Sequence, residues 1–256
     1  MTIPQFRHIV WTYYKNSGRH DLPWRKTKDL YKILVSEVML QQTQVHRVLP
    51  VYAEFTRRFP TARKLAAAPL SEVLKSWQGL GYNRRAKQLR AAAQALTTKN
   101  RRHTVEELEK LSGVGPYTAR AIAAFAYNQN VIFVETNIRT AIIHHFFSRR
   151  SGVEDTEVLE VLKKILPKGK AREWYSALMD YGAFLKRSGI SHNAKSKTYV
   201  KQSKFTGSLR EARGAILREF TRGTTSRTRL VNLLGPSRRA QMKRALEALI
   251  KEGLIT

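Results

Sequence analysis

Residues 111–126 read LSGVGPYTARAIAAFA, a Gly-Val-Gly turn between two helical patterns. The segment before the turn begins at Thr104 and places Glu107 three residues later, which is the capping-box signature of a helix start. After the turn, Pro116 suits the first position of a second helix, where its missing N–H group would have no intrahelical partner. The stretch therefore predicts two helices joined by a tight hairpin.

The two glycines of the turn raise the question of what the hairpin binds. Gly113 and Gly115 allow positive φ angles and a close backbone approach, which would leave peptide N–H groups exposed beside the positive end of a helix. Such a helix start binds phosphate. An ordinary interhelical turn with a glycine cap is the favoured interpretation when the pattern is taken alone. Both interpretations stay open at this point.

The charge balance indicates the class of partner. The chain of 256 residues holds 47 Lys and Arg against 19 Asp and Glu, a formal net charge of +28. Such an excess is typical of a protein that binds a polyanion, and nucleic acid comes before a membrane surface because no apolar run reaches the roughly 18 to 20 residues of a span. With no secretory leader before the polar start MTIPQFRH, we expect a soluble, cytoplasmic, monomeric protein that acts on DNA.

The absence of cysteine excludes several kinds of site. With 0 Cys, disulfides, thiolate zinc sites and cysteine-held iron–sulfur clusters are all excluded. Of the 7 histidines, His144 and His145 are adjacent and would point to different faces of a helix, and no HExxH pattern occurs. We therefore expect no metal site.

Hydrophobic spacing predicts an all-α protein. From Tyr31 to about Phe147, and again over residues 158–185, apolar residues recur at helical intervals, while the period-two alternation of a sheet is scarce. The β-branched run VIFVETNIR at 131–139 is the exception, and we interpret it as an extended entry into a helix.

The C-terminal part of the chain is strongly basic. Residues 186–204 form a basic strap or linker, and residues 186–256 together hold 17 basic and 4 acidic residues, a net of +13. The last fifty residues return to helical periodicity in three stretches, which resembles a helix-turn-helix or winged-helix domain. At the start of the last stretch, Arg238, Arg239 and Lys243 are predicted to contact DNA. The alternative is a solvated amphipathic tail.

Two acidic residues stand in mostly apolar or amide surroundings and are candidates for chemistry. They are Glu37 in LVSEVMLQQTQV and Glu135 in VIFVETNIR. Burial disfavours the ionised form of a carboxyl group, so a buried acid can deliver a proton at neutral pH. A pair of carboxyl groups matches glycosidic cleavage, in which one protonates the leaving group and the other faces an oxocarbenium-like centre. A satisfied structural carboxylate is the alternative for each.

Three strings together resemble the helix-hairpin-helix DNA glycosylases, and most closely the MutY-type adenine glycosylases. They are SEVMLQQTQV at 36–45, GLGYNRRA at 79–86 and LSGVGPYTARAIAAFAY at 111–127, within a match that covers about residues 11–185. The resemblance implies a six-helix barrel at 27–137 that carries the hairpin, and a helical bundle from 1–26 plus 138–205. We expect residues 206–256 to form a separate basic winged-helix-like domain, and the resemblance implies a substrate base flipped out between barrel and bundle.

The resemblance also implies roles for the residues of the reaction centre. Glu37 matches the general acid that protonates the purine. Glu135, beside Asn137, stands where the family has its essential aspartate, and the extra methylene shifts the carboxylate at a scale to which catalysis is sensitive. Tyr117 occupies the position of the Schiff-base lysine of the bifunctional lyases such as endonuclease III, so strand cleavage by β-elimination is not expected.

Further residues match positions that contact DNA. Gln41, Gln42 and Tyr82 match residues that insert into the duplex or touch the opposite base, since flat and amide side chains can fill the gap left by a flipped nucleotide. The remaining predicted contacts are Arg84 and the hairpin residues Gly113, Val114, Gly115, Tyr117 and Thr118. The hairpin carbonyls are also a candidate site for a monovalent cation.

Two departures from the family narrow the expected function. Where the family has four cysteines around an iron–sulfur cluster, this chain continues from WYSALMDYGAFLK into the cysteine-free KRSGISHNAKSKTY. The family's NUDIX-like domain, which reads 8-oxoguanine, is replaced by basic helical residues. We therefore expect a protein without an iron–sulfur cluster, whose preference for the opposite base is the least determined part of the resemblance.

The leading hypothesis is a monofunctional adenine DNA glycosylase of base excision repair that acts on adenine opposite 8-oxoguanine or guanine. A thymine or uracil mismatch glycosylase is the second hypothesis, because relatives of that kind share the hairpin and a tyrosine at the lysine position. A non-catalytic binder of DNA lesions is the third, favoured by the change at Glu135 and by the extra basic domain.

Overall fold

Residues 1–97, 102–190, 204–223 and 226–255 are described by a computed structural model. The regular structure in these ranges is helical and includes no strand, which confirms the predicted all-α class. The chain forms two compact units, the first drawn from Met1–Leu34, His103–Lys110 and Val114–Lys201 and the second from Val35–Arg102, Leu111–Gly113 and Gln202–Thr256. The predicted division at 27–137 and 206–256 stays a prediction.

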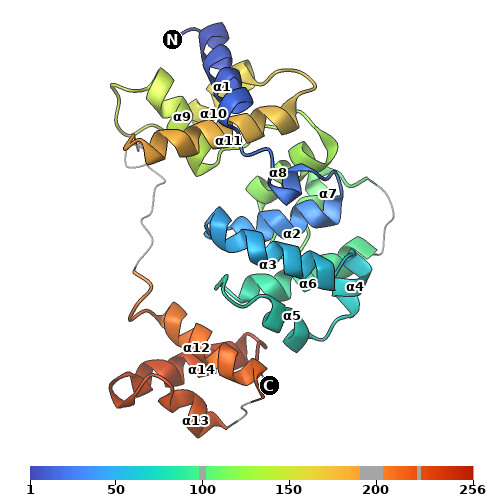
Figure 1. Ribbon diagram of the computed structural model, residues 1–256, viewed down its shortest axis with the longest axis vertical. Coiled ribbons are helices and arrows are strands. Elements are labelled where there is room, and N and C mark those ends of the chain that lie inside the picture. The colour runs from blue at the N-terminus through green and yellow to red at the C-terminus, as the bar shows by residue number, and fades with distance from the viewer. Residues whose placement is uncertain (98–101, 191–203, 224–225, 256) are drawn as a thin grey trace. The chain divides into compact units, whose positions relative to one another are not determined.

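The first unit is built around α11 (Ala171–Arg187). Its other helical elements are α1 (Ile3–Ser17), η1 (Pro23–Arg25), α7 (Val105–Glu109), α8 (Pro116–Tyr127), α9 (Thr136–Phe146) and α10 (Asp155–Ile165) (Figure 1). Along α11, Trp174, Leu178, Tyr181 and Leu185 recur at intervals of three and four residues and are buried. This apolar stripe packs against α9 and α1.

Local helix signals in the first unit act as the sequence predicts. The Thr104 side chain accepts from the Glu107 N–H, and the Glu107 side chain accepts from the Thr104 N–H, so α7 starts with a complete capping box. Pro116 is in the first turn of α8. Residues 131–135 lie outside regular structure and lead into α9, and the last of them, Glu135, has the extended backbone that the sequence predicted for this entry.

The second unit contains most of α2 (Leu30–Leu40) and the helices that follow it. These are α3 (Val45–Arg58), α4 (Ala62–Ala67), α5 (Leu70–Ser76) and α6 (Arg84–Thr97), and later in the chain α12 (Leu209–Thr221), α13 (Arg227–Asn232), η3 (Pro236–Arg238) and α14 (Arg239–Lys251). Phe55 and Trp77 are buried in its core with their rings edge to face, 5.9 Å between centroids.

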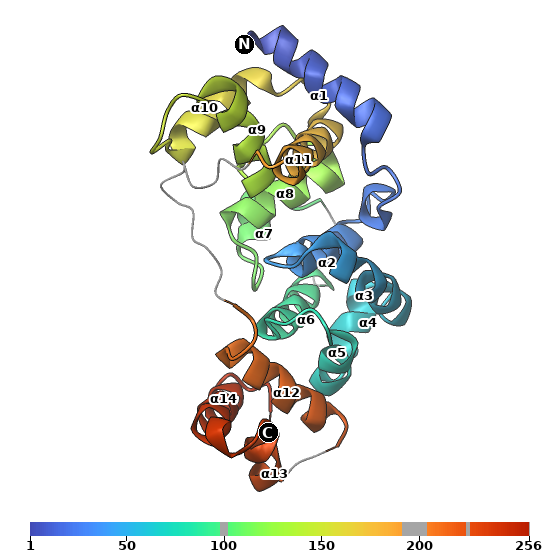
Figure 2. The same ribbon diagram turned by 60° about the vertical axis from the view of Figure 1, so that its left-hand side comes forward.

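Residues 204–223 and 226–255, here called the C-terminal module, contain the three predicted helical stretches. Helix α12 packs against α13 and α14 (Figure 2), and it also packs against α5. The Gln78 amide donates to the Thr221 hydroxyl at 2.6 Å. The module is thus joined to the rest of the second unit by helix packing and by this hydrogen bond. No β wing occurs in these two ranges.

Two expectations from the sequence can be compared with the structure only within the described residues. The predicted basic strap at 186–204 begins in the last turn of α11, but its residues 191–203 lie outside the described part of the chain. Among the helices that are described, none is long and apolar enough to cross a membrane.

Candidate active site

Glu37 lies in the middle of α2, in the second unit, with 8% of its surface exposed. Its helix neighbours Val35, Ser36 and Val38 are each exposed by 1% or less, so the acid is held in a closely packed segment. Burial in general disfavours the ionised form of a carboxyl group and so favours the form that can donate a proton. The surroundings of Glu37 suit a general acid.

The end of α2 is organised by Arg85, a buried residue in the first turn of α6. Its guanidinium donates to the carbonyl oxygens of Val38 (2.8 Å), Met39 (3.0 Å), Leu80 (3.3 Å), Gly81 (3.2 Å) and Gln41, and to the Thr43 hydroxyl (3.0 Å). Burial lowers the pKa of Arg85 to about 10. One cation thus ties the turn after α2 to the turn before α6.

Sequence reasoning missed Arg85, although a signal was present. In α6 the buried stripe runs through Leu89 and Ala92, four and seven residues after Arg85. An arginine at a stripe position requires partners in the interior. Here backbone carbonyls supply them.

Arg85 joins the turns that carry four of the predicted DNA-contact residues. Gln41, Gln42, Tyr82 and Arg84 line one cavity of about 420 Å³. Gln42 and Tyr82 have positive φ angles of 54° and 46°, a conformation that residues other than glycine adopt rarely and that clusters at binding sites. The structure therefore brings these residues together, and their roles toward DNA stay predictions.

The predicted hairpin forms between α7 and α8, with one correction. Gly113 has a φ of +78°, as expected, and a Cβ added there would lie 2.9 Å from the Gln88 Cβ. Gly115 has a φ of −91°, so the expectation of a positive φ at this second glycine was wrong. A Cβ at Gly115 would meet nothing within 4 Å, which leaves open space in front of the first turn of α8.

The other hairpin residues divide between the interior and the surface. Val114 and Thr118 are 5% and 3% exposed, so their backbone rather than their side chains could contact a ligand. Tyr117 is half-buried, and its ring meets Phe133 edge to face at 5.6 Å. The first amides of a helix lack intrahelical acceptors, which suits the start of α8 for an anion.

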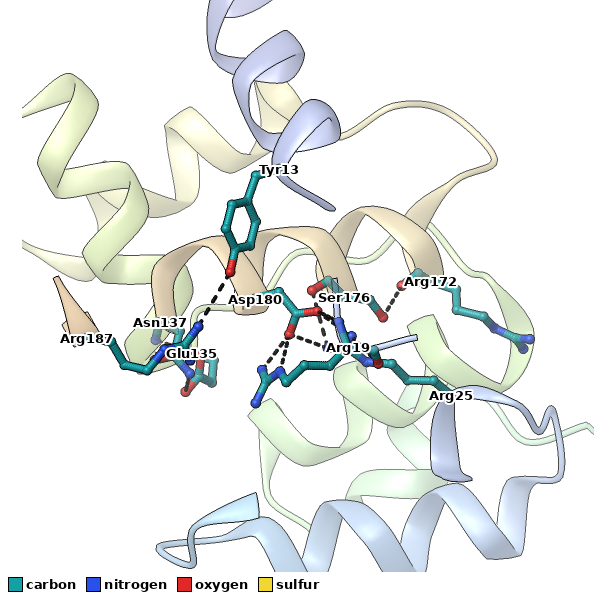
Figure 3. Close-up of polar contacts among 9 residues, drawn as sticks. All are labelled: Tyr13, Arg19, Arg25, Glu135, Asn137, Arg172, Ser176, Asp180 and Arg187. Atoms are coloured by element: carbon teal, nitrogen blue, oxygen red, sulfur yellow. Dashed lines mark hydrogen bonds and ion pairs between the residues drawn. The ribbon is translucent and has the colours of Figure 1, made fainter. Parts of the chain in front are cut away.

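Glu135 caps the start of α9, in the first unit, and its side chain folds back onto that helix. Its carboxylate accepts from the Asn137 N–H (2.7 Å), the Asn137 side-chain amide (3.0 Å) and the Thr136 hydroxyl (2.6 Å). Glu135 and Asn137 lie together in Figure 3. These hydrogen bonds hold the Glu135 side chain in one orientation at the start of α9, with Asn137 as its partner.

The backbone of Asn137 is packed tightly against α11. A Cβ added at Gly182 would lie 1.9 Å from the Asn137 carbonyl oxygen, so only glycine fits there without displacing one of the helices. Lys186, one turn further along α11, is half-buried. Burial lowers the pKa of Lys186, while the charge of Glu135 acts in the opposite direction. Helix α11 therefore sets both the position and the electrostatic surroundings of the Glu135 cap.

Asp180, also on α11, anchors the N-terminal segment and was not singled out from the sequence. It is 2% exposed and accepts from the Arg19 N–H (2.8 Å) and from the guanidiniums of Arg19 (2.6 Å) and Arg25 (2.6 and 2.9 Å) (Figure 3). Burial alone raises the pKa of Asp180, but the hydrogen bonds and charges of the two arginines outweigh burial and lower it. The signal was an acid within the otherwise apolar run ALMDYGAFL of α11.

The three predicted contacts in the C-terminal module differ in their surroundings. Arg238 forms an ion pair with Glu211 at 2.6 Å, so it holds the module together. Arg239 and Lys243 are exposed on α14, one turn apart, as a phosphate contact requires. The DNA contacts of all three stay predictions.

Comparison with known proteins identifies the family. Residues 35–168 match the HhH-GPD superfamily base excision DNA repair proteins. The chain belongs to this superfamily. It is 36% identical to the adenine DNA glycosylase of Mycolicibacterium smegmatis, with 93% of this chain and 88% of the relative aligned, and 33% identical to that of Mycobacterium tuberculosis, with 98% and 91% aligned.

A solved HhH-GPD neighbour has the same fold over most of its length. It is a thermostable thymine-DNA glycosylase with a TM-score of 0.61 and 26% identity, aligned over 71% of this chain and 86% of its own. The cysteine-held cluster of the superfamily does not fit this chain, which has 0 Cys. In the described part of the chain, no group of three or more His, Asp or Glu side chains could hold a metal ion.

Proposed function

We propose that this HhH-GPD protein is a monofunctional adenine DNA glycosylase of base excision repair. The observation that carries the proposal is the buried Glu37 within SEVMLQQTQV, in a chain that aligns over almost its full length with adenine DNA glycosylases. A purine is a poor leaving group until it is protonated, and a buried carboxylic acid can supply that proton. Glu37 is therefore the general acid of the proposed reaction.

Glu135 is the second carboxylate of the proposed mechanism. As the N-glycosidic bond breaks, the base leaves with the proton from Glu37, and positive charge develops on the sugar as in glycoside hydrolysis. The Glu135 carboxylate, oriented by the start of α9, stabilises this charge. Water then adds its hydroxyl group to the anomeric carbon, and its remaining proton restores the acid.

DNA binding in this proposal uses the hairpin between α7 and α8 and the side chains of the two turns that Arg85 joins. The amides at the start of α8 contact a phosphate on a mismatched or damaged duplex, and Gln41, Gln42 and Tyr82 enter the gap beside the flipped adenine. The base opposite is 8-oxoguanine or guanine. The protein acts as a monomer without a resident metal cofactor, apart from a monovalent cation at the hairpin carbonyls.

The proposal includes the absence of strand cleavage. β-Elimination requires an amine that forms a Schiff base with the abasic sugar, and Tyr117 occupies the family position of that amine. We expect the product strand to stay intact until alkali is added. A borohydride-trapped complex of protein and DNA would contradict this part of the proposal.

A gel assay tests the function. Duplexes with A:8-oxoG, A:G, G:T, G:U or hypoxanthine pairs are incubated with excess protein, and alkali then converts abasic sites into breaks. Breaks at adenine alone support the proposal. Breaks at thymine or uracil support the mismatch glycosylase, which the likeness to a thymine-DNA glycosylase favours as the second candidate. Tight binding without breaks on any duplex would support the non-catalytic lesion binder.

A further inference from the structure

The cavity of about 420 Å³ in the second unit is lined by two separate parts of that unit. One part is the pair of turns joined by Arg85, which present Gln41, Gln42 and Tyr82. The other part is the C-terminal module, which contributes Arg210 and Arg213 from α12 and Glu252 from the end of α14.

Arg210 contacts both the hydroxyl group and the ring of Tyr82. Its guanidinium donates to the Tyr82 hydroxyl at 3.1 Å, and the guanidinium carbon lies 5.6 Å from the centroid of the tyrosine ring. This cation–π contact fixes the plane of the guanidinium beside a flat aromatic surface. Helix α12 thus places the Arg210 guanidinium beside the Tyr82 ring, which is expected to contact the opposite base.

The carboxylate in the cavity wall is neutralised by the module itself. Arg213 binds Glu252 with two hydrogen bonds of 2.9 and 2.7 Å, and Lys87 donates to the Glu252 carbonyl oxygen at 2.6 Å. The hydrogen bonds from Arg213 lower the pKa of Glu252. The cavity therefore presents hydrogen-bond donors and an aromatic ring, which suits a flat ligand with neighbouring acceptor atoms.

Resting on the proposed adenine glycosylase function, we propose that Arg210 reads the base opposite the excised adenine, so that the C-terminal module forms part of the specificity site. A guanidinium fork matches the neighbouring O6 and N7 acceptors on the major-groove edge of guanine. The same edge of cytosine offers no acceptor pair, and 8-oxoguanine carries a hydrogen on N7, so the base that Arg210 reads is guanine. Tyr82 orients this guanidinium through its hydroxyl group and its ring.

Binding to a duplex that cannot react tests this role apart from catalysis. A stable tetrahydrofuran abasic analogue is placed opposite guanine, 2-aminopurine or cytosine, and affinity is measured by fluorescence anisotropy. 2-Aminopurine keeps the shape of guanine but lacks O6. The wild-type protein is expected to prefer guanine, and Arg210→Ala to reduce that preference roughly 5- to 100-fold, as for the removal of a bidentate hydrogen bond to a base. Arg210→Lys should behave like Arg210→Ala, because an ammonium lacks the fork.

Arg218→Ala is the matched control, since Arg218 is exposed on the same helix and does not line the cavity. It removes the same charge and should leave the preference for guanine unchanged. If Arg210→Ala weakens all three duplexes equally, Arg210 is a phosphate contact and the inference is wrong. A wild-type protein without preference for guanine would also overturn it. Failure of adenine release in the gel assay would instead refute the proposed function, and the binding result would remain separate.

Discussion

The surroundings of Glu37 and Glu135 differ, and so do the roles proposed for them. Glu37 is buried in mid-helix, with 8% of its surface exposed. Glu135 is half-buried at a helix start, where an N–H, an amide and a hydroxyl donate hydrogen bonds to its carboxyl group. In the proposed mechanism, two residues of one type serve as a proton donor and a charge stabiliser because the backbone places them differently.

Removing the acidic proton of Glu37 is expected to have the largest effect. Glu37→Gln keeps size and hydrogen bonding but cannot protonate the purine, so single-turnover excision should slow by about 10²- to 10⁴-fold. The matched control is Glu54→Gln, the same change at an exposed site on α3. A Glu37→Gln rate within a few fold of wild type would exclude Glu37 from the mechanism.

The contribution of Glu135 to excision is expected to come from its negative charge rather than from a proton that it donates. Glu135→Gln removes the charge and should reduce single-turnover excision by roughly 10²-fold or more, as for the removal of one preorganised electrostatic interaction. Glu135→Asp keeps the charge, restores the family residue and should stay active or improve. Equal rates for all three proteins would assign Glu135 to structure alone.

The close packing of α11 against the Asn137 backbone, which supports the Glu135 cap, can be tested by changing Gly182. In Gly182→Ala the new methyl group must displace the Asn137 backbone, so excision should fall by roughly 10- to 100-fold, since a shift of about 1 Å in a site has effects of that size. Overpacking should also lower the free energy of unfolding by about 1–3 kcal/mol. Gly214→Ala is the control, because its Cβ meets nothing within 4 Å. Excision and unfolding that match wild type would show that α11 does not position the cap.

Low pH should lower the stability of the first unit, because the ion pairs of Asp180 are then lost. Because its folded pKa is lowered, its ion pairs stabilise the protein above the usual value of 3.8, and this stability is lost as pH falls through the folded pKa. Asp180→Asn should lower the free energy of unfolding by about 3 kcal/mol near neutral pH. The difference from wild type in thermal unfolding should shrink below pH 3.8. A difference that stays constant into strong acid would contradict this origin.

Changing the exposed pair Arg239 and Lys243 on α14 should alter the affinity for DNA but not the function of Glu37 or Glu135. Arg239→Gln with Lys243→Gln should flatten the plot of log affinity against log salt by roughly 0.9 for each phosphate that is no longer neutralised. The single-turnover rate at saturating protein should not change. Arg238→Gln is the contrasting variant, since Arg238 pairs with Glu211 and should affect thermal unfolding more than the salt slope. Unchanged salt slopes would exclude α14 from the DNA interface.

Sequence patterns predicted the features that depend on neighbouring residues. The capping box of Thr104 and Glu107, the position of Pro116 and the extended entry before α9 each follow from local backbone chemistry, and each occurs in the structure. The positive φ expected at Gly115 failed because glycine permits that conformation without requiring it.

The all-helical class and the presence of acids in apolar surroundings follow from the sequence by itself, because helical spacing and local composition are properties of short segments. Only tertiary structure decided that Arg85 joins two turns, that Gly182 admits the Asn137 backbone and that Arg210 reaches Tyr82. These contacts join segments that are far apart in the chain. Their formation depends on how whole helices pack, which no local pattern encodes.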